Sequence, residues 1–292
     1  MIQQIKKYAS LVVFAHTLFA LPFAIIGFVL ACSIVQPHSI WLLLGQVLVC
    51  MVTARNSAMS FNRYADRYID AQNERTSARE LPSGKLSSKS VLLFFLVNAA
   101  LFIACAWSIN RLCFWLAFPA LAVLCGYSYT KRFTWLCHFV LGLALAIAPA
   151  GAYIAVTGVL VLPVFWLSVM VALWAGGFDI LYALPDELHD RAHGLRSIPQ
   201  RFGRRKALWI SGGLHVLVLP AMVLFGFSVH LGLGYWIAAI IFAGLLIYQH
   251  AIIGVHDISK LNRAFFTTNG IASVLFAALT IADLLQRAFF CA

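Results

Sequence analysis

Acidic residues form two clusters whose spacing is typical of a metal site. Asp66 and Asp70 are four residues apart, and Asn62 lies four residues before Asp66. On a helix, a spacing of four advances about 40° around the axis and about 6 Å along it, which predicts a slanted row of oxygen ligands on one face. Asp186 and Asp190 repeat this spacing 120 residues later. We name Asn62, Asp66 and Asp70 the first acidic cluster, and Asp186 and Asp190 the second.

Ligands that are all oxygen favour a hard cation. Mg²⁺ usually joins one or two carboxylates to substrate phosphates, so both clusters are predicted to hold Mg²⁺ against a phosphate-bearing substrate. For any single Asp the alternative is a solvated surface ion pair, which contributes little. Two matching spacings favour the metal site instead. Asp179 lies two predicted turns before Asp186 on the same face. Because an ionisable group near a membrane span is costly, we predict that Asp179 is functional and binds substrate.

Basic residues accompany both clusters. Residues 75–85 follow the first cluster and residues 196–203 follow the second, and each stretch contains Arg or Lys; Tyr127 and Lys131 lie between them. A diphosphate carries several negative charges, so a metal and cations such as Arg79 and Lys131 would clamp it together. The alternative is that these cations only set the membrane topology. That alternative does not explain why they interleave with acids at fixed spacing.

The composition shows which elements must position these residues. Hydrophobic residues make up 62% of the 292 and charged residues 11%, and the mean hydropathy is +0.90. A soluble domain carries roughly twice that charged fraction, so a soluble fold is excluded. The apolar runs reach the ~20 residues that cross a bilayer. The sequence therefore predicts an all-α fold, a polytopic membrane bundle of about nine transmembrane helices in a single domain, residues 1–292. The predicted spans are residues 9–33, 40–61, 90–109, 112–129, 135–157, 161–184, 207–227, 231–250 and 267–286.

The positive charges mark one side of the membrane. Of the 21 Lys and Arg residues, 18 fall in the N-terminus and in the loops after the second, fourth, sixth and eighth spans. The positive-inside rule places these segments in the cytoplasm, and nine spans then place the C-terminus outside. Nine of the ten carboxylates lie on the same side. The net charge of +11 is thus explained by topology, and we predict no nucleic-acid partner.

Taken in order, these motifs resemble one family. The chain is similar to the UbiA superfamily of intramembrane aromatic prenyltransferases, which are bundles of nine helices. Each matching motif follows an even-numbered predicted span, so the resemblance covers most of the chain. The matching residues are Asn62, Asp66 and Asp70 with Arg75-Thr76 and Arg79-Glu80-Leu81-Pro82-Ser83-Gly84 behind them, then Tyr127 and Lys131, then Asp179, Asp186 and Asp190.

The resemblance implies an activity and a location. The activity is transfer of a polyprenyl chain from its diphosphate to an aromatic carboxylic acid of the 4-hydroxybenzoate type, in respiratory quinone biosynthesis. The location is the bacterial cytoplasmic (inner) membrane, with the active site facing the cytoplasm and no protein partner implied. Mg²⁺ would be held by the two acidic clusters, with Arg79, Tyr127 and Lys131 on the remaining diphosphate oxygens. The residues implied to be catalytic are Asp66, Asp70, Lys131, Asp186 and Asp190.

Arg55 is predicted to contact the acceptor. It lies seven residues before Asn62 on the same helix face, inside a predicted span, where an Arg is costly. We hypothesise that it binds the carboxylate of the aromatic acceptor; the rival explanation is a side chain that reaches the membrane interface. Arg63 follows Asn62, where 4-hydroxybenzoate enzymes usually carry Asp. The stretch 55–63 resembles a bacterial branch often labelled 4-hydroxybenzoate polyprenyltransferase. The resemblance includes members that serve the futalosine route to menaquinone, with a dihydroxynaphthoate acceptor, and Arg55 does not separate the two acceptors.

Three other interpretations compete with this one: a secondary transporter, a CDP-alcohol phosphotransferase, whose aspartate motif is not present in the sequence, and a zinc site. A secondary transporter would need helices broken near the midplane, and Pro149 with Gly151 could supply such a break in the fifth span. The acids cluster at one face instead, which favours chemistry. His189 and His193 have the i,i+4 spacing of a zinc site but lack the rest of a zinc motif.

Overall fold

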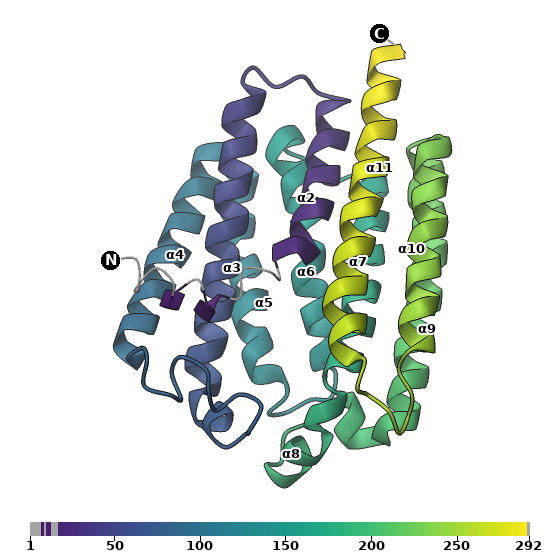
Figure 1. Cartoon of the computed structure of the whole chain (residues 1–292). Helices are drawn as coiled ribbons and strands as arrows, with labels where there is room; N and C mark the ends of the chain where they lie inside the picture. Colours follow the sequence, from purple (N-terminus) through teal and green to yellow (C-terminus); the bar gives the residue numbers. More distant parts are fainter. Residues whose placement is uncertain (1–6, 9, 13–16, 291–292) are drawn as a thin grey trace.

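The computed structural model describes residues 7–8, 10–12 and 17–290, and this part of the chain folds as a bundle of long helices without strands (Figure 1). Eight of these helices are long and apolar enough to cross a membrane, and the shorter apolar helix α2 adds a ninth. The predicted all-α membrane bundle of about nine spans is therefore confirmed. Within the first predicted span, residues 9 and 13–16 lie outside the described residues.

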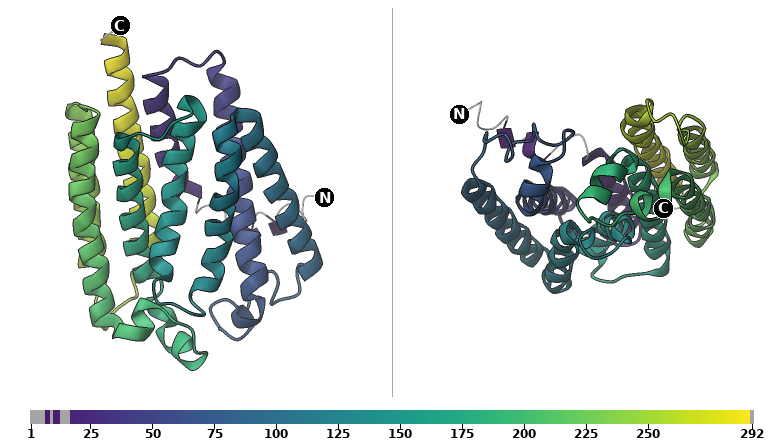
Figure 2. Two further views of the ribbon diagram at one scale, coloured as in Figure 1. Left: turned by 180° about the vertical axis from the view of Figure 1, so that it is seen from behind. Right: turned by 90° about the horizontal axis from the view of Figure 1, so that it is seen from below.

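The elements alternate between the two ends of the bundle. The connections that follow α3, α5, α7 and α10 lie at one end together with α8, whereas the α2–α3 connection and the end of α11 lie at the other (Figure 1 and Figure 2). This is the alternation that the charge distribution predicts. In order, the elements are α2 (Thr17–Cys32), α3 (Ile40–Ala71), α4 (Ser88–Ile109), α5 (Arg111–Thr130), α6 (Cys137–Thr157), α7 (Leu162–Tyr182), η2 (Leu184–Asp186), α8 (Glu187–Ala192), α9 (Ile198–Ser228), α10 (Leu233–Ala251), η3 (Arg263–Thr268) and α11 (Asn269–Phe290).

Helix α3 is longer than the span predicted for it. The sequence predicts a span that ends at residue 61, but α3 continues to Ala71 and has 32 residues. A helix of that length measures about 48 Å at 1.5 Å per residue, well beyond the roughly 30 Å hydrocarbon core. Its last turns therefore extend beyond the length that a hydrocarbon core would cover, at the end that carries the basic connections. The first acidic cluster lies on these turns.

The break between the third and fourth spans is confirmed. Asn110 Oδ1 accepts a hydrogen bond from the Cys113 backbone N at 2.8 Å, which caps the start of α5. Asn110 Nδ2 donates to the carbonyl oxygen of Ile154 at 3.0 Å and so ties this turn to α6. Pro149 does not break its helix, because it lies inside an uninterrupted α6. The discontinuous helix that the transporter interpretation needs does not form there.

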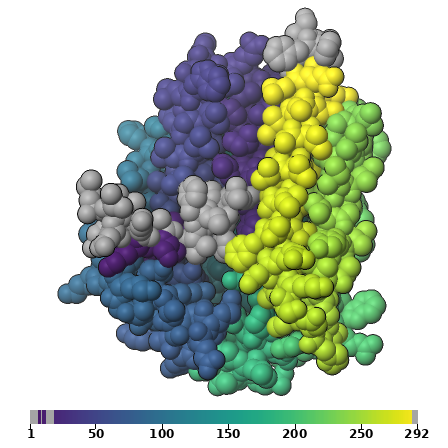
Figure 3. All heavy atoms as spheres, viewed as in Figure 1, coloured from purple at the N-terminus to yellow at the C-terminus, as the bar shows by residue number. Residues whose placement is uncertain are grey.

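The tightest packing surrounds α7. Within its apolar stretch 67% of the residues are buried, against 11% for α4 and for α5. Trp174 in α7 contacts the rings of Phe23 and Phe242, and its indole N–H donates to Asn269 Oδ1 at 3.0 Å. Helices α10 and α11 run side by side along this part of the bundle, on the face shown in Figure 3. α7 is thus anchored from the α2, α10 and α11 side.

Two glycines bring α6 close to its neighbours. A Cβ atom at Gly142 would lie 2.2 Å from the carbonyl oxygen of Ala172 in α7, so no larger residue fits there. A Cβ atom at Gly27 in α2 would lie 2.3 Å from the carbonyl oxygen of Pro149. Small residues allow helix backbones in a membrane to approach in this way. The N-terminal part of α6 is therefore held against α7, toward the end of the bundle where the basic connections and the predicted site residues lie.

Candidate active site

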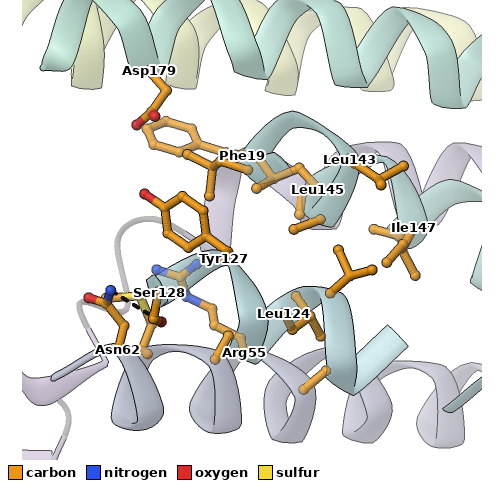
Figure 4. A pocket seen from close by; sticks show the side chains of 18 of the residues that line it. Phe19, Arg55, Asn62, Leu124, Tyr127, Ser128, Leu143, Leu145, Ile147 and Asp179 are labelled. Atoms are coloured by element: carbon orange, nitrogen blue, oxygen red, sulfur yellow. Dashed lines mark hydrogen bonds between the residues drawn. The ribbon is translucent and has the colours of Figure 1, made fainter. Parts of the chain in front are cut away.

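A cavity of about 1180 Å³ lies between α3, α5, α6 and α7, and all ten predicted site residues line it. Its polar residues gather toward the end with the basic connections, while apolar side chains line the rest, as Figure 4 shows for Leu124, Leu143, Leu145 and Ile147. One cavity therefore joins a charged end to an apolar channel. The ten residues are Arg55, Asn62, Asp66, Asp70, Arg79, Tyr127, Lys131, Asp179, Asp186 and Asp190.

The first acidic cluster has the predicted row geometry. Asn62 Nδ2 donates to Asp66 Oδ2 at 3.1 Å, four residues along α3, and lies 3.4 Å from Ser128 Oγ in α5. Asp66 is buried, and its Oδ1 accepts a hydrogen bond from Arg132 Nη2 at 3.1 Å. The helix thus presents Asn62 and Asp66 as one connected pair. Arg132 was not among the predicted site residues, although it follows Lys131 directly.

Asp70 has an available oxygen. Its Oδ1 accepts a hydrogen bond from Arg79 Nη1 at 2.7 Å, and its backbone carbonyl accepts one from Thr76 Oγ1 at 2.9 Å. Its Oδ2 is buried and has no hydrogen-bond partner within the described residues. A buried carboxylate oxygen without a partner is costly unless something else satisfies it. A divalent cation would satisfy it, so this donor set fits Mg²⁺.

The second acidic cluster is built differently from the prediction. The sequence predicts Asp179 and Asp186 on one continuous helix face, and this is wrong because α7 ends at Tyr182. Pro185 cannot donate a helical hydrogen bond and disfavours helix before it. The chain therefore forms the short 3₁₀ turn η2, and α8 carries Asp190 as a separate helix.

Arg75 holds Asp186. Arg75 Nε donates to Asp186 Oδ1 at 3.0 Å, its Nη2 donates to Asp186 Oδ2, and Asn73 Nδ2 also donates to Oδ1 at 3.2 Å. The Arg75 guanidinium lies over the ring of Tyr182, which stacks on Phe265 of the π-helical turn η3 with ring centroids 4.1 Å apart. A chain of contacts thus crosses one side of the cavity at its polar end. From the sequence, Arg75 was identified by its place in the basic stretch 75–85 and by the Arg75-Thr76 match, but its contact with Asp186 was not predicted.

Asp190 is buried beside the start of α9. Its Oδ2 accepts a hydrogen bond from Ser197 Oγ at 2.8 Å. Burial raises the pKa of the Asp190 carboxyl above its ordinary value, while the charge of Lys131 and the Ser197 hydrogen bond act in the opposite direction. Lys131 is therefore close enough to Asp190 to act on it electrostatically. The loop also fixes Lys131, because its backbone carbonyl accepts a hydrogen bond from the Arg196 N at 2.6 Å.

Asp179, Tyr127 and Arg55 face the same space. Figure 4 shows the hydroxyl of Tyr127 directed toward Asp179, with Arg55 extending into the cavity from α3. Asp179 Oδ2 lies 2.7 Å from His138 Nδ1. Arg55 Nη2 donates to the backbone carbonyl of Val12 at 3.3 Å. The location of Arg55 within a membrane-spanning helix is as predicted, and its side chain reaches the cavity. His138 was not predicted, because nothing in its local sequence marks it.

The described part of the chain holds no group of three His, Cys, Asp or Glu side chains arranged to bind a metal ion by themselves. A cation at either acidic cluster would need further oxygen ligands, which Mg²⁺ usually takes from water and substrate phosphates. His189 and His193 stack with ring centroids 4.0 Å apart, and His193 Nδ1 donates a hydrogen bond to the His189 carbonyl oxygen at 2.9 Å. That arrangement does not form a zinc site.

Comparison with known proteins gives a consistent result. A family model described as the UbiA prenyltransferase family matches residues 20–271. The 4-hydroxybenzoate octaprenyltransferase of Tolumonas auensis is 30% identical over 228 residues, which cover 78% of this chain and 79% of that protein. The 4-hydroxybenzoate octaprenyltransferase of Aliivibrio fischeri is 32% identical over 247 residues, covering 84% and 85%.

Solved structures share the fold. An apo UbiA homologue from Aeropyrum pernix superposes with a TM-score of 0.83 at 28% identity, covering 92% of this chain and 98% of that one. A UbiA homologue from Archaeoglobus fulgidus bound to DMAPP and Mg²⁺ superposes with a TM-score of 0.75 at 22% identity, covering 96% and 99%. The family model spans most of the chain, and the curated relatives match it over more than two thirds of its length. The chain belongs to the UbiA prenyltransferase family.

Proposed function

We propose that this protein is a Mg²⁺-dependent polyprenyltransferase that joins a polyprenyl chain to an aromatic carboxylic acid of the 4-hydroxybenzoate type, in respiratory quinone biosynthesis. One observation carries the proposal: a single cavity of about 1180 Å³ has carboxylates and cations at one end and an apolar channel beyond them. A polyprenyl diphosphate has the same division into a charged head and a long apolar tail. The names of the curated relatives support the acceptor class.

The charged end would bind the diphosphate. The two acidic clusters would hold Mg²⁺, with the buried Asp70 Oδ2 as the most available ligand. When bound, Mg²⁺ supplies neutralisation of charge on the leaving diphosphate. Arg79, Lys131 and Tyr127 line the same end and would donate hydrogen bonds to the remaining oxygens.

The chemistry proceeds in three bond changes. The bond between the first prenyl carbon and the diphosphate oxygen breaks, and the electron pair leaves with the diphosphate. A ring carbon ortho to the hydroxyl of the acceptor then attacks the allylic cation, and the ring passes one proton to the released diphosphate as it regains aromaticity. We assign Asp179 the hydrogen bond from the ring hydroxyl, which increases electron density at that carbon. The apolar walls keep water away from the cation.

Arg55 would bind the carboxylate of the acceptor. A guanidinium recognises a carboxylate with two parallel hydrogen bonds, and this one extends into the cavity near Tyr127 (Figure 4). Replacing Arg55 with Ala should raise the KM for the aromatic acid about 30-fold or more, because a charge-assisted contact is lost, while binding of the prenyl diphosphate changes little. Arg111→Ala at the opposite end of the bundle is the matched control. Unchanged acceptor kinetics in Arg55→Ala would exclude this role.

The site is proposed to face the cytoplasm of a bacterium, at its inner membrane. The connections at the charged end of the cavity hold most of the Lys and Arg residues, and such loops stay on the cytoplasmic side. The water-soluble acceptor and the diphosphate head would then both reach the site from the cytoplasm.

The decisive test is product formation. Membranes containing the protein are incubated with octaprenyl diphosphate, Mg²⁺ and a panel that includes 4-hydroxybenzoate and 1,4-dihydroxy-2-naphthoate, and the extracts are analysed by mass spectrometry. We expect a prenylated acid that requires both Mg²⁺ and the protein. The favoured acceptor in the panel decides between the ubiquinone and menaquinone routes. No prenylated product from any member would overturn the proposal.

A further inference from the structure

His138 is a buried titratable residue that the proposed reaction has not yet used. It lies in the first turn of α6, only 2% of its surface is exposed, and its side chain lines the cavity. A buried imidazole in a membrane-spanning bundle is costly unless both ring nitrogens are satisfied. The partners of these two nitrogens therefore indicate what the ring does.

Both ring nitrogens have partners, and together they define the tautomer. The backbone N–H of Ile198, at the start of α9, points at His138 Nε2 across 3.4 Å, so Nε2 acts as the acceptor. Nδ1 then carries the hydrogen and donates it to Asp179 Oδ2 at 2.7 Å. Asp179 is itself buried, with 9% of its surface exposed. The ring thus presents one fixed N–H to one fixed carboxylate.

The surrounding structure keeps the ring in place. Gly142 lets α6 approach α7 closely one turn after His138. Ile198, whose N–H contacts the ring, is the first residue of α9 and directly follows Ser197, which donates a hydrogen bond to Asp190. Ser197 Oγ also accepts a hydrogen bond from the Gln200 N and caps α9. The backbone around His138 is therefore rigid, and rotation of the ring would break both of its hydrogen bonds.

We propose that His138 is a positioning residue for the acceptor: its Nδ1–H holds one oxygen of Asp179, which leaves the other oxygen aimed past Tyr127 to accept the hydroxyl hydrogen of the aromatic substrate. Figure 4 shows Asp179 and the Tyr127 hydroxyl directed toward each other within the cavity. This inference rests on the proposed function, because it concerns how the protein binds the aromatic acceptor which that function requires. It predicts that His138 acts on acceptor recognition and not on the diphosphate.

Packing alone is the rival explanation. A ring at this position also fills space between α6 and α7, so a large apolar replacement would keep the packing and remove only the donor. The amides of Asn and Gln separate the two roles further. Asn places its N–H near the position of Nδ1, whereas Gln places it near Nε2. If the Nδ1 donor matters, the two similar residues will behave differently.

The experiment compares His138→Asn, His138→Gln and His138→Phe with the wild type in purified, folded form, with octaprenyl diphosphate and 4-hydroxybenzoate as substrates. In His138→Gln and His138→Phe, kcat/KM for 4-hydroxybenzoate should fall about 10- to 100-fold, the size expected for losing a hydrogen bond to a charged group. His138→Asn should retain activity to within about fivefold. The KM for the diphosphate should change by less than about threefold in all three.

A second measurement tests the contact with the acceptor hydroxyl separately from the contact with its carboxylate. Benzoate has the carboxylate of the acceptor but lacks its hydroxyl, so its inhibition constant should change by less than about threefold in His138→Gln. His215→Phe is the control for removing a buried His, because His215 is equally buried and bonded to His250 but does not line the cavity. Its acceptor kinetics should match those of the wild type.

The outcomes separate the two proposals. Absence of prenylated product from the wild type would overturn the proposed function. An active wild type with equal kinetics in His138→Asn and His138→Gln would overturn the inference alone, and so would a parallel loss of benzoate binding. If His138→Phe does not fold, as judged by gel filtration in detergent, the Asn and Gln pair decides.

Discussion

The two acidic clusters line one cavity but have different supports. Asn62, Asp66 and Asp70 project from α3, which is uninterrupted from Ile40 to Ala71. Asp186 and Asp190 lie beyond the break at Pro185, on a 3₁₀ turn and a helix of six residues. A long helix fixes the spacing of its side chains, whereas short elements joined by turns can shift with lower cost. We expect the first cluster to be the rigid side of the site and the second to be the adjustable side.

The hydrogen-bond partners of the two acidic clusters also differ. In the first cluster Asp70 Oδ2 has no hydrogen-bond partner within the described residues. In the second, Arg75 donates to both oxygens of Asp186. Arg79 and Arg132 each hold only one oxygen of their carboxylate in the first cluster, which leaves Asp70 Oδ2 for a cation. A cation at Asp186 would instead compete with a guanidinium for both oxygens. With a diphosphate bound, Arg75 would donate its hydrogen bonds to phosphate oxygens, and Asp186 would then be free to hold Mg²⁺.

The largest expected effect is on the first cluster. Asp70→Asn removes the charge at the available oxygen, and we expect kcat/KM to fall about 1000-fold because transition-state charge is no longer neutralised. The Mg²⁺ concentration that gives half-maximal activity should rise as well. Both quantities come from a Mg²⁺ titration of product formation. Asp257→Asn is the control, since Asp257 is an exposed acid in a connection at the same end.

Asp186→Asn should have a smaller effect, about 100-fold in kcat/KM, because both oxygens of this carboxylate already accept hydrogen bonds from Arg75. In the same titration, the Mg²⁺ concentration that gives half-maximal activity should rise less in Asp186→Asn than in Asp70→Asn. Equal losses in the two variants, with equal shifts in the Mg²⁺ requirement, would contradict the division into a rigid side and an adjustable side.

Arg75→Ala tests how the adjustable side works. We expect a loss of about 30-fold, since the variant loses a cation for the diphosphate but also frees Asp186. A double-mutant cycle with Asp186→Asn should be non-additive, because the two side chains contact each other. Additive losses would show that the contact has no part in catalysis.

The geometry of the first acidic cluster was more predictable from the sequence than that of the second. The row on α3 was predictable because a helical spacing of four needs only a continuous helix, and no Pro or Gly interrupts residues 46–71. For the second cluster the spacing was the same, but Pro185 ends the helix before Asp186, so the predicted common face with Asp179 was wrong. The order of the motifs and the positive charge of the loops were sufficient to place both clusters at one end of the bundle.

The partners of the acids were beyond the reach of local patterns. Arg75 meets Asp186 across 111 positions in the sequence, and His138 meets Asp179 across 41. Such pairings depend on how helices dock, and docking here depends on details such as the Gly142 contact between α6 and α7. The cations and carboxylates could be identified from the sequence, but which cation meets which carboxylate could not.

The smallest expected effect belongs to Ser197, which supports the second cluster through one neutral donor. Ser197→Ala removes the 2.8 Å hydrogen bond to Asp190 and the cap on the Gln200 N. Because a single such bond contributes about 1 kcal/mol, we expect kcat/KM to fall about fivefold and the melting temperature to decrease by a few degrees. Ser87→Ala removes a comparable cap at the start of α4, outside the cavity, and should lower only the melting temperature. If Ser197→Ala reduced activity as strongly as Asp186→Asn, the second cluster would depend on a fixed Asp190, and it would be as rigid as the first.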